Sequence, residues 1–164
     1  MTALLLALVL SQSPAAAPPE VARVDLARYA GTWHEQARFD TFFQKGCFAS
    51  TATYTLKADG ELKVENRCHQ DRPDGTLKGI EGKAWVPDPA VPGKLRVQFF
   101  WPFSGPYWVL EVADDYSWAL VGHPERTRCW IFTRAETIDE GLYQQLVEKL
   151  RARGYDVSKL LRAR

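Results

Sequence analysis

The chain has 164 residues, of which 46% are hydrophobic and 25% are charged, and its formal net charge is +1. This length corresponds to one domain, and the composition excludes intrinsic disorder, which requires low hydrophobicity or a large net charge. It also argues against a nucleic-acid-binding protein, which would carry a clustered basic excess. Aromatic residues make up 12% of the chain, and such large rings suit either a packed core or the lining of a ligand cavity.

The N-terminus resembles a secretory signal peptide. Residues 3–10 are entirely apolar and are followed by small residues. An apolar run of this length cannot span a bilayer core, which needs about 20 residues, but it suits a signal peptide cleaved near Ala15–Ala17. Because no Lys or Arg precedes the run, a flexible apolar tail or a misplaced start codon remains the alternative. We expect a signal peptide over residues 1–17 and an exported domain over residues 18–164, periplasmic or secreted and soluble, since no lipoprotein cysteine follows the run.

The middle of the chain has the pattern of an all-β domain. Apolar and polar residues alternate in short segments separated by turn signals such as Asp59-Gly60 and Asp74-Gly75. In the first segment, the apolar face is expected to hold Trp33, Glu35, Ala37 and Phe39. The spacing predicts eight strands and excludes alternation of strands with long helices, with strands at residues 32–39, 51–56, 61–67, 80–86, 95–100, 107–112, 118–121 and 129–133.

One amphipathic helix is predicted after the last strand. Thr137 and Glu140 form the pattern of a capping box, in which both side chains satisfy free backbone N–H groups. Apolar residues then recur at helical spacing, and Gly154 is a typical stop. We expect a helix over about residues 138–153, packed on the outside of the β domain.

Several motifs, in order, resemble the lipocalin family, most closely its bacterial lipocalin and apolipoprotein D branch. Gly31-Thr32-Trp33 resembles the G-x-W signature of the first strand, and the match extends from about Val24 to Leu161. Its landmarks include the segments at residues 52–54, 80–82, 99–103, 107–110, 119–121 and 154–160. The second family motif reads Ala113-Asp114-Asp115-Tyr116, without the usual leading Asp. The resemblance implies an eight-stranded antiparallel up-and-down barrel, whose interior can hold one small ligand.

The resemblance also implies which residues face a ligand cavity. Combined with strand alternation, it predicts a cavity lined by Tyr54, Asn66, Val97, Phe99, Tyr107, Val109 and Trp130, with Leu56, Val64 and Leu95 as further inward positions. The alternative for the aromatic residues is a packed core, and for Asn66 it is an amide satisfied at a strand edge or turn. An apolar lining with few polar groups favours a flexible acyl chain.

Two residue pairs are expected to be structural. Trp33 and Arg134 resemble the closed-end pair of the family, in which the guanidinium covers the indole ring. The chain has three cysteines, so at most one disulfide forms within it. By the strand order that the resemblance implies, Cys47 and Cys68 meet at the open end and are expected to pair, leaving Cys129 as a free thiol. A zinc site built from Cys47, Cys68 and His69 is the alternative, although the expectation is that no metal is bound.

Aromatic residues also gather near the open end. Exposed apolar residues there can form a lid, contact a membrane surface or form a homodimer interface. The alternative, which is the simplest expectation, is that these rings pack over the cavity mouth. These residues are Phe39, Phe42, Phe43, Trp101 and Phe103.

The expected function is binding and transport of a small hydrophobic ligand, with a fatty acid or a lysophospholipid as the expected ligand. No cofactor, nucleic-acid partner or catalytic residue is expected, since the motifs of serine hydrolases, zinc proteases and nucleotide-binding enzymes do not occur in the sequence. Two alternatives remain. One is an enzyme acting on lipids or peroxides, with Glu111 as its candidate acid or base if its side chain faces inward; the alternative for Glu111 is an ion pair at the barrel floor or an outward position at a turn. The other is a plugged barrel that serves as a structural or oligomeric module.

Overall fold

The computed structural model describes residues 17–163, so the predicted signal peptide lies almost entirely outside the described residues. Within these residues the domain contains nine strands and two α-helices, with bounds as follows: α1 (Leu26–Tyr29), β1 (Gly31–Phe39), β2 (Cys47–Leu56), β3 (Leu62–Gln70), β4 (Leu77–Trp85), β5 (Lys94–Phe100), β6 (Phe103–Val112), β7 (Trp118–Gly122), β8 (Cys129–Thr133), α2 (Glu140–Ala152) and β9 (Leu160–Arg162). Two 3₁₀ turns, η1 (Phe42–Gln44) and η2 (Val157–Lys159), complete it.

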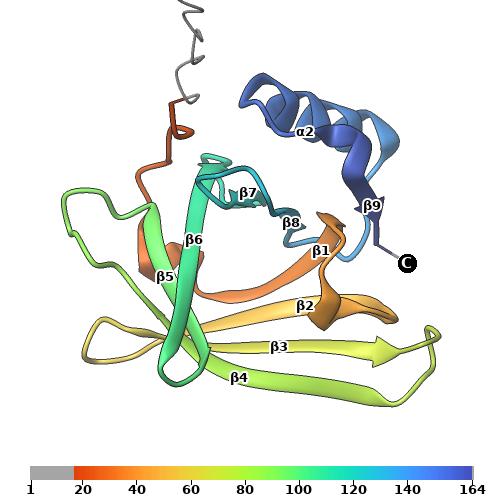
Figure 1. Ribbon diagram of the computed structural model, residues 1–164, viewed down its shortest axis with the longest axis horizontal. Helices are drawn as coiled ribbons and strands as arrows, with labels where there is room; N and C mark the ends of the chain where they lie inside the picture. The colour runs from red at the N-terminus through yellow and green to blue at the C-terminus, as the bar shows by residue number, and fades with distance from the viewer. Residues whose placement is uncertain (1–16, 164) are drawn as a thin grey trace, which may run out of the picture.

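The strands form a closed antiparallel barrel (Figure 1), as predicted. Consecutive strands pair from β2–β3 to β7–β8, and β1 pairs with both β8 and β2. Closure provides hydrogen-bond partners for the backbone N–H and C=O groups that the edge strands of an open sheet would expose. The short strand β9 pairs with the end of β1 from Ala37 to Phe39, beyond the last β1–β2 pair. Near the closed end β1 therefore pairs with β2 and completes the barrel. Toward the mouth, β9 pairs with the same edge of β1 in place of β2.

The helix α2 packs on the outer wall, as expected. Leu146 and Leu150 are fully buried with Leu120 and Ile131 of β7 and β8 in a second apolar cluster outside the barrel. The predicted capping box is wrong: the N-cap is Asp139, whose carboxylate accepts a hydrogen bond from the backbone N–H of Leu142. None of the helices within residues 17–163 has the length and apolar character needed to cross a membrane.

A bulge in β1 changes which of its side chains face inward. The register with β8 shifts between Glu35 and Ala37, so two residues of β1 lie opposite one residue of β8. Beyond this bulge Ala37 and Phe39 face outward into the cluster beneath α2. The expected face shared by Glu35, Ala37 and Phe39 is therefore wrong, and Arg38 lies opposite the inward residue Trp130.

The strands extend further toward the open end than the sequence indicates. β2 begins at Cys47 rather than at residue 51, and β6 begins at Phe103, where Pro102 and Pro106 predicted a loop. Pro106 lies beyond the β6–β7 ladder, whose pairs begin at Trp108 and Gly122, so on that side no neighbouring strand needs the donor that proline lacks. The longer strands raise the barrel wall around the mouth.

Candidate functional site

The barrel interior is the candidate site, and it has a polar floor, largely apolar walls and a polar mouth. All seven residues predicted from the sequence as ligand contacts come from the inner faces of the strands. Three of the seven are buried in the interior cluster, namely Tyr54, Tyr107 and Val109, together with the further inward positions Val64 and Leu95. Three more are partly buried against this cluster, namely Val97, Phe99 and Trp130. Asn66 pairs with Ala52 of that cluster and so shares its face. Leu56 pairs with the buried Leu62 and shares the inner face, but it is itself exposed at the closed end of β2 and lines no cavity there.

Depth separates these residues into packed core and open wall. Val109 and Leu95 have almost no exposed surface and lie near the closed end, so they act as core. Val97 and Phe99 are partly exposed higher on the same wall. Gly82 lies next to Phe99, and a Cβ at Gly82 would stand 2.7 Å from the Phe99 ring. The glycine therefore leaves the space that the Phe99 ring occupies.

Three tyrosine hydroxyls meet near the closed end of the barrel. The Tyr54 hydroxyl donates to the Tyr107 hydroxyl at 2.7 Å, and the hydroxyls of Tyr107 and Tyr29 are 2.8 Å apart. Tyr29 comes from the short helix α1, Tyr54 from β2 and Tyr107 from β6. Burial raises the pKa of all three phenols, so they are neutral and keep their hydrogens.

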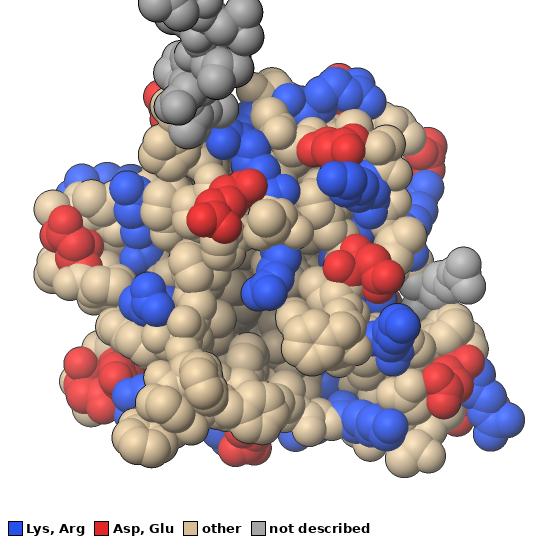
Figure 2. Space-filling model, viewed as in Figure 1, with Lys and Arg blue, Asp and Glu red and all other residues tan. Residues whose placement is uncertain are grey.

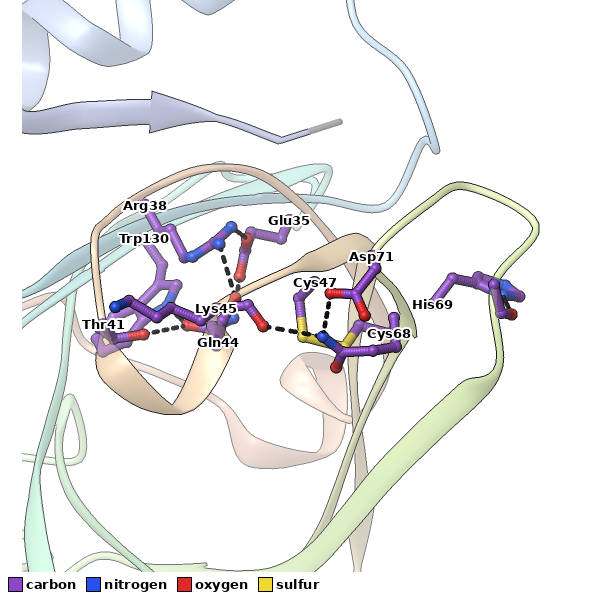
Figure 3. Close-up of a disulfide and its surroundings, with 12 residues drawn as sticks. Glu35, Arg38, Thr41, Gln44, Lys45, Cys47, Cys68, His69, Asp71 and Trp130 are labelled. Atoms are coloured by element: carbon purple, nitrogen blue, oxygen red, sulfur yellow. Dashed lines mark hydrogen bonds and ion pairs between the residues drawn. A yellow bond between two sulfur atoms is a disulfide. The ribbon is translucent and has the colours of Figure 1, made fainter.

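The mouth holds a buried ion pair that the sequence analysis missed (Figure 3). Arg38 donates to the Glu35 carboxylate at 2.7 Å, and the two residues are only 7% and 5% exposed. Gln44 of the β1–β2 connection joins them: its amide donates to Glu35 at 2.7 Å, and its backbone carbonyl accepts from Arg38 at 3.1 Å. Its side-chain oxygen accepts from the Trp130 indole at 3.2 Å and from the Thr41 hydroxyl. Burial raises the pKa of the Glu35 carboxyl, against the opposing effect of Arg38.

A disulfide fixes the same connection to the barrel. Cys47 and Cys68 are bonded, as expected, at the open ends of β2 and β3 (Figure 3). The Gln70 amide bridges the connection by donating to the Lys45 carbonyl and the Asp71 carboxylate. Because the two thiols are used in the disulfide, the alternative zinc site is wrong. The remaining thiol, Cys129, is buried beneath α2, on the face opposite to Trp130.

The rim of the open end is aromatic and exposed. Phe42 is 84% exposed and Trp101 is 86% exposed, and Phe43, Phe100 and Phe103 are also exposed. Figure 2 shows the centre of this face hollowed between the β5–β6 turn and the β1–β2 connection. The rings therefore do not pack over the mouth, which was the simplest expectation. Phe39, expected on the rim, is instead buried against Tyr155 beneath α2.

Glu111, the candidate acid or base of the enzymatic alternative, does not face the interior. The register of β6 with β7 shifts between Val109 and Glu111, which turns Glu111 outward. Its carboxylate lies 2.7 Å from both Lys149 and Arg153 near the end of α2. It serves to attach the helix to the wall.

Trp33 and Arg134 form the closed-end pair that the resemblance implied. The guanidinium carbon of Arg134 lies 3.8 Å from the centre of the Trp33 indole ring, which has no exposed surface. The Trp33 indole N–H donates to the Tyr29 carbonyl at 2.8 Å. The Arg134 guanidinium also donates to the backbone carbonyls that precede and begin β1, those of Arg28, Tyr29, Ala30 and Thr32.

Sequence reasoning missed the polar groups at both ends of the interior. Glu35 stood out as a charged residue on a predicted apolar face, which is a usable sign of a buried carboxylate with a partner. Nothing in the local pattern marks the bulge that turns Arg38 inward. Tyr29 precedes the first strand, and its inward position depends on how α1 covers the closed end.

Comparisons with known proteins agree with this architecture. A family model described as a lipocalin-like domain matches residues 24–164. Outer membrane lipoprotein Blc of Escherichia coli (strain K12) is 39% identical over 152 residues, covering 92% of this chain and 85% of that protein. Apolipoprotein D of Bos taurus is 40% identical over 117 residues, covering 70% of this chain and 59% of that protein. Insecticyanin from the tobacco hornworm Manduca sexta is a structural neighbour with a TM-score of 0.69 and 21% identity, covering 93% of this chain and 86% of that chain.

Proposed function

Because the chain belongs to the lipocalin family, whose members bind small hydrophobic ligands, we propose that it carries one acyl lipid, a fatty acid or a lysophospholipid, inside its barrel. The observation that carries the proposal is the inner face itself: partly exposed Val97, Phe99 and Trp130 line the way from the mouth toward a polar floor. Such a lining suits a flexible apolar chain with few polar groups to orient it.

The affinity that such a lining can reach is considerable. Each CH₂ group that leaves water contributes about 0.8 kcal/mol, offset by the cost of ordering the chain and the side chains around it. A micromolar dissociation constant needs about 8 kcal/mol, so a long acyl chain reaches it after these costs. The mechanism is reversible transfer of the chain from water into the barrel, with no bond broken.

Titration with a fluorescent fatty acid tests the proposal. We expect saturable binding of one ligand per chain with quenching of Trp130, and competition by a lysophospholipid. In Val97→Trp the larger ring fills the interior, and the affinity should fall at least tenfold. Leu56→Trp, which adds the same ring at an exposed position at the closed end, away from the mouth, should bind as the unchanged protein does.

Other results of the same titration would contradict the proposal. An absence of binding would favour the plugged structural module, and conversion of the lipid to a product would favour the enzyme. The outward position of Glu111, paired with Lys149 and Arg153, argues against its use as an interior acid or base. Homologues of this chain are lipocalins, generally proteins of binding and transport.

We further propose that the protein acts after export, in the periplasm or as a secreted protein. The Cys47–Cys68 disulfide supports this location, since disulfides persist in oxidising compartments. Fractionation of the native host, with the protein recovered outside the cytoplasm, is the expected result.

The aromatic rim suggests contact with a membrane surface. The mouth through which a lipid would pass is surrounded by the exposed rings of Phe42, Phe43, Phe100, Trp101 and Phe103. Figure 2 shows uncharged surface below the hollow and a basic side chain at its upper edge. Exposed aromatic rings at a lipid entrance favour the interfacial region of a bilayer. A second copy of the chain is the alternative occupant, in a homodimer.

Vesicle binding distinguishes these occupants. We expect the protein to co-sediment with phosphatidylcholine vesicles, and the double variant Trp101→Ser/Phe103→Ser to lose at least fivefold in partitioning. Leu56→Ser, an exposed apolar residue at the closed end, should leave partitioning unchanged. Unchanged vesicle binding in the double variant, together with loss of a dimer by light scattering, would assign the rim to self-association instead.

A further inference from the structure

The three tyrosine hydroxyls of the floor contain one hydrogen more than they use. Three neutral hydroxyls carry three hydrogens, and two hydrogen bonds join them. Tyr54 donates to Tyr107, so either Tyr107 donates to Tyr29 and the Tyr29 hydrogen is left over, or Tyr29 donates to Tyr107 and the Tyr107 hydrogen is left over. Tyr29 has no exposed surface, whereas Tyr107 has the most of the three. The second arrangement therefore presents the spare hydrogen to the interior.

That arrangement also makes Tyr107 the stronger donor. Its oxygen then accepts two hydrogen bonds, from Tyr29 and from Tyr54, and each accepted bond polarises the O–H group further. A buried donor without an acceptor is costly. The floor is therefore prepared for a hydrogen-bond acceptor that comes from outside the chain.

Asn66 provides the complementary group on the adjoining wall. Its side-chain oxygen is buried and has no hydrogen-bond partner. Tyr54 pairs with Val64 and Ala52 pairs with Asn66, so Asn66 and Tyr54 are diagonal neighbours on the inner face, about 7–8 Å apart along the sheet. Since an Asn amide can present its oxygen or its nitrogen, the best partner for Asn66 is a group that both donates and accepts.

We propose, on the basis of the proposed lipid-carrying function, that the preferred ligand is a hydroxylated acyl chain whose hydroxyl accepts from Tyr107 and donates to Asn66. A plain alkyl chain laid against these groups would keep both away from water and offer no hydrogen bond in return. A hydroxyl is the smallest group that satisfies the donor and the acceptor together. The preference follows from polar groups inside the barrel and does not depend on the nature of the lipid head group.

Competition between matched ligands tests the inference. The competitors are stearic acid and stearic acids that carry one hydroxyl at a single position, from carbon 3 to carbon 18. The experiment measures how well each competitor displaces a fluorescent fatty acid from the barrel. We expect at least one hydroxylated isomer to bind about tenfold more tightly than stearic acid. Its methyl ether, which accepts a hydrogen bond but cannot donate one, should lose most of that advantage.

Variants then assign the preference to the two residues. The ratio of the dissociation constants of stearic acid and the best isomer should fall to about one in Tyr107→Phe and in Asn66→Leu. Tyr29→Phe is the matched control: it removes a hydroxyl from the same cluster but leaves the Tyr107 hydrogen free, so the ratio should persist. If Tyr107→Phe does not fold, Asn66→Leu carries the test alone.

The possible results distinguish the preference for a hydroxylated chain from the proposed acyl-lipid carriage on which it rests. Equal affinity for stearic acid and every hydroxylated isomer, or a preference that survives in Asn66→Leu, would overturn the hydroxyl inference and leave acyl-chain carriage intact. Failure of every ligand, stearic acid included, to displace the probe would overturn both.

Discussion

Replacing Trp33 with alanine should lower the free energy of unfolding by about 3–5 kcal/mol, the range for a buried tryptophan. The indole has no exposed surface, and its loss leaves a cavity at the closed end beneath the Arg134 guanidinium. It also removes the donor to the Tyr29 carbonyl. For a domain of this size the melting temperature should fall by roughly 6–20 °C.

Urea unfolding followed by circular dichroism measures this loss. Trp101→Ala, which removes the same ring from a position 86% exposed, should change the free energy of unfolding by less than about 0.5 kcal/mol. The ligand affinity of the folded fraction of Trp33→Ala should remain within about threefold of the unchanged protein, because Trp33 belongs to the closed end. An affinity loss without a change in melting temperature would show instead that Trp33 contacts the ligand.

The alternation of apolar and polar residues was sufficient to predict the strands and the inner face. Tyr54, Tyr107 and Trp130 were correctly placed toward the interior, because a strand that pairs on both sides keeps a strict period of two. The prediction failed at β1 and β6, where one extra residue reverses the parity beyond it. The bulges are not marked by glycine or proline. Alternation therefore placed Phe39 and Arg38 on the wrong faces of β1, and for Glu111 it left the inward position open beside the outward, ion-paired position that the structure shows.

The polar ends of the interior depend on contacts between distant parts of the chain. Tyr29 and Tyr107 are separated by 78 residues, and Gln44 and Trp130 by 86. Local propensity carries no information on such pairs. The family resemblance supplied the barrel, and only the three-dimensional arrangement shows that a tyrosine cluster lies at its floor and an ion pair at its mouth.

The ion pair at the mouth should respond unequally to the loss of its two partners. Removing one member of a buried pair leaves the other without compensation, and this typically costs about 3–5 kcal/mol. Glu35→Met should show the full loss, because the remaining Arg38 guanidinium cannot give up its charge in a protein. Arg38→Met should cost less, about 1–3 kcal/mol, since the remaining Glu35 carboxyl can take up a proton and become neutral.

The pH dependence of the two variants gives the decisive measurement. Burial already raises the pKa of Glu35 in the unchanged protein, and Arg38 is the largest opposing influence; without Arg38 the pKa rises further. A carboxyl whose pKa is higher in the folded state than in the unfolded state contributes stability at low pH, and that contribution is lost as the pH rises through the folded-state pKa. The advantage of Arg38→Met over Glu35→Met should therefore be largest near pH 5 and shrink toward pH 8.

The double variant Glu35→Met/Arg38→Met completes the cycle. With neither charge of the pair present, it should be more stable than Glu35→Met at every pH, because apolar residues of similar size replace buried ion pairs at little cost. Gln44 loses its bonds to both residues and keeps those to Trp130 and Thr41, so part of the β1–β2 connection stays attached. Urea unfolding of the four proteins at pH 5 and pH 8 gives the coupling energy. Equal stability of Arg38→Met and Glu35→Met at pH 5 would contradict this prediction, because it would show that the buried Glu35 carboxyl stays charged when Arg38 is absent.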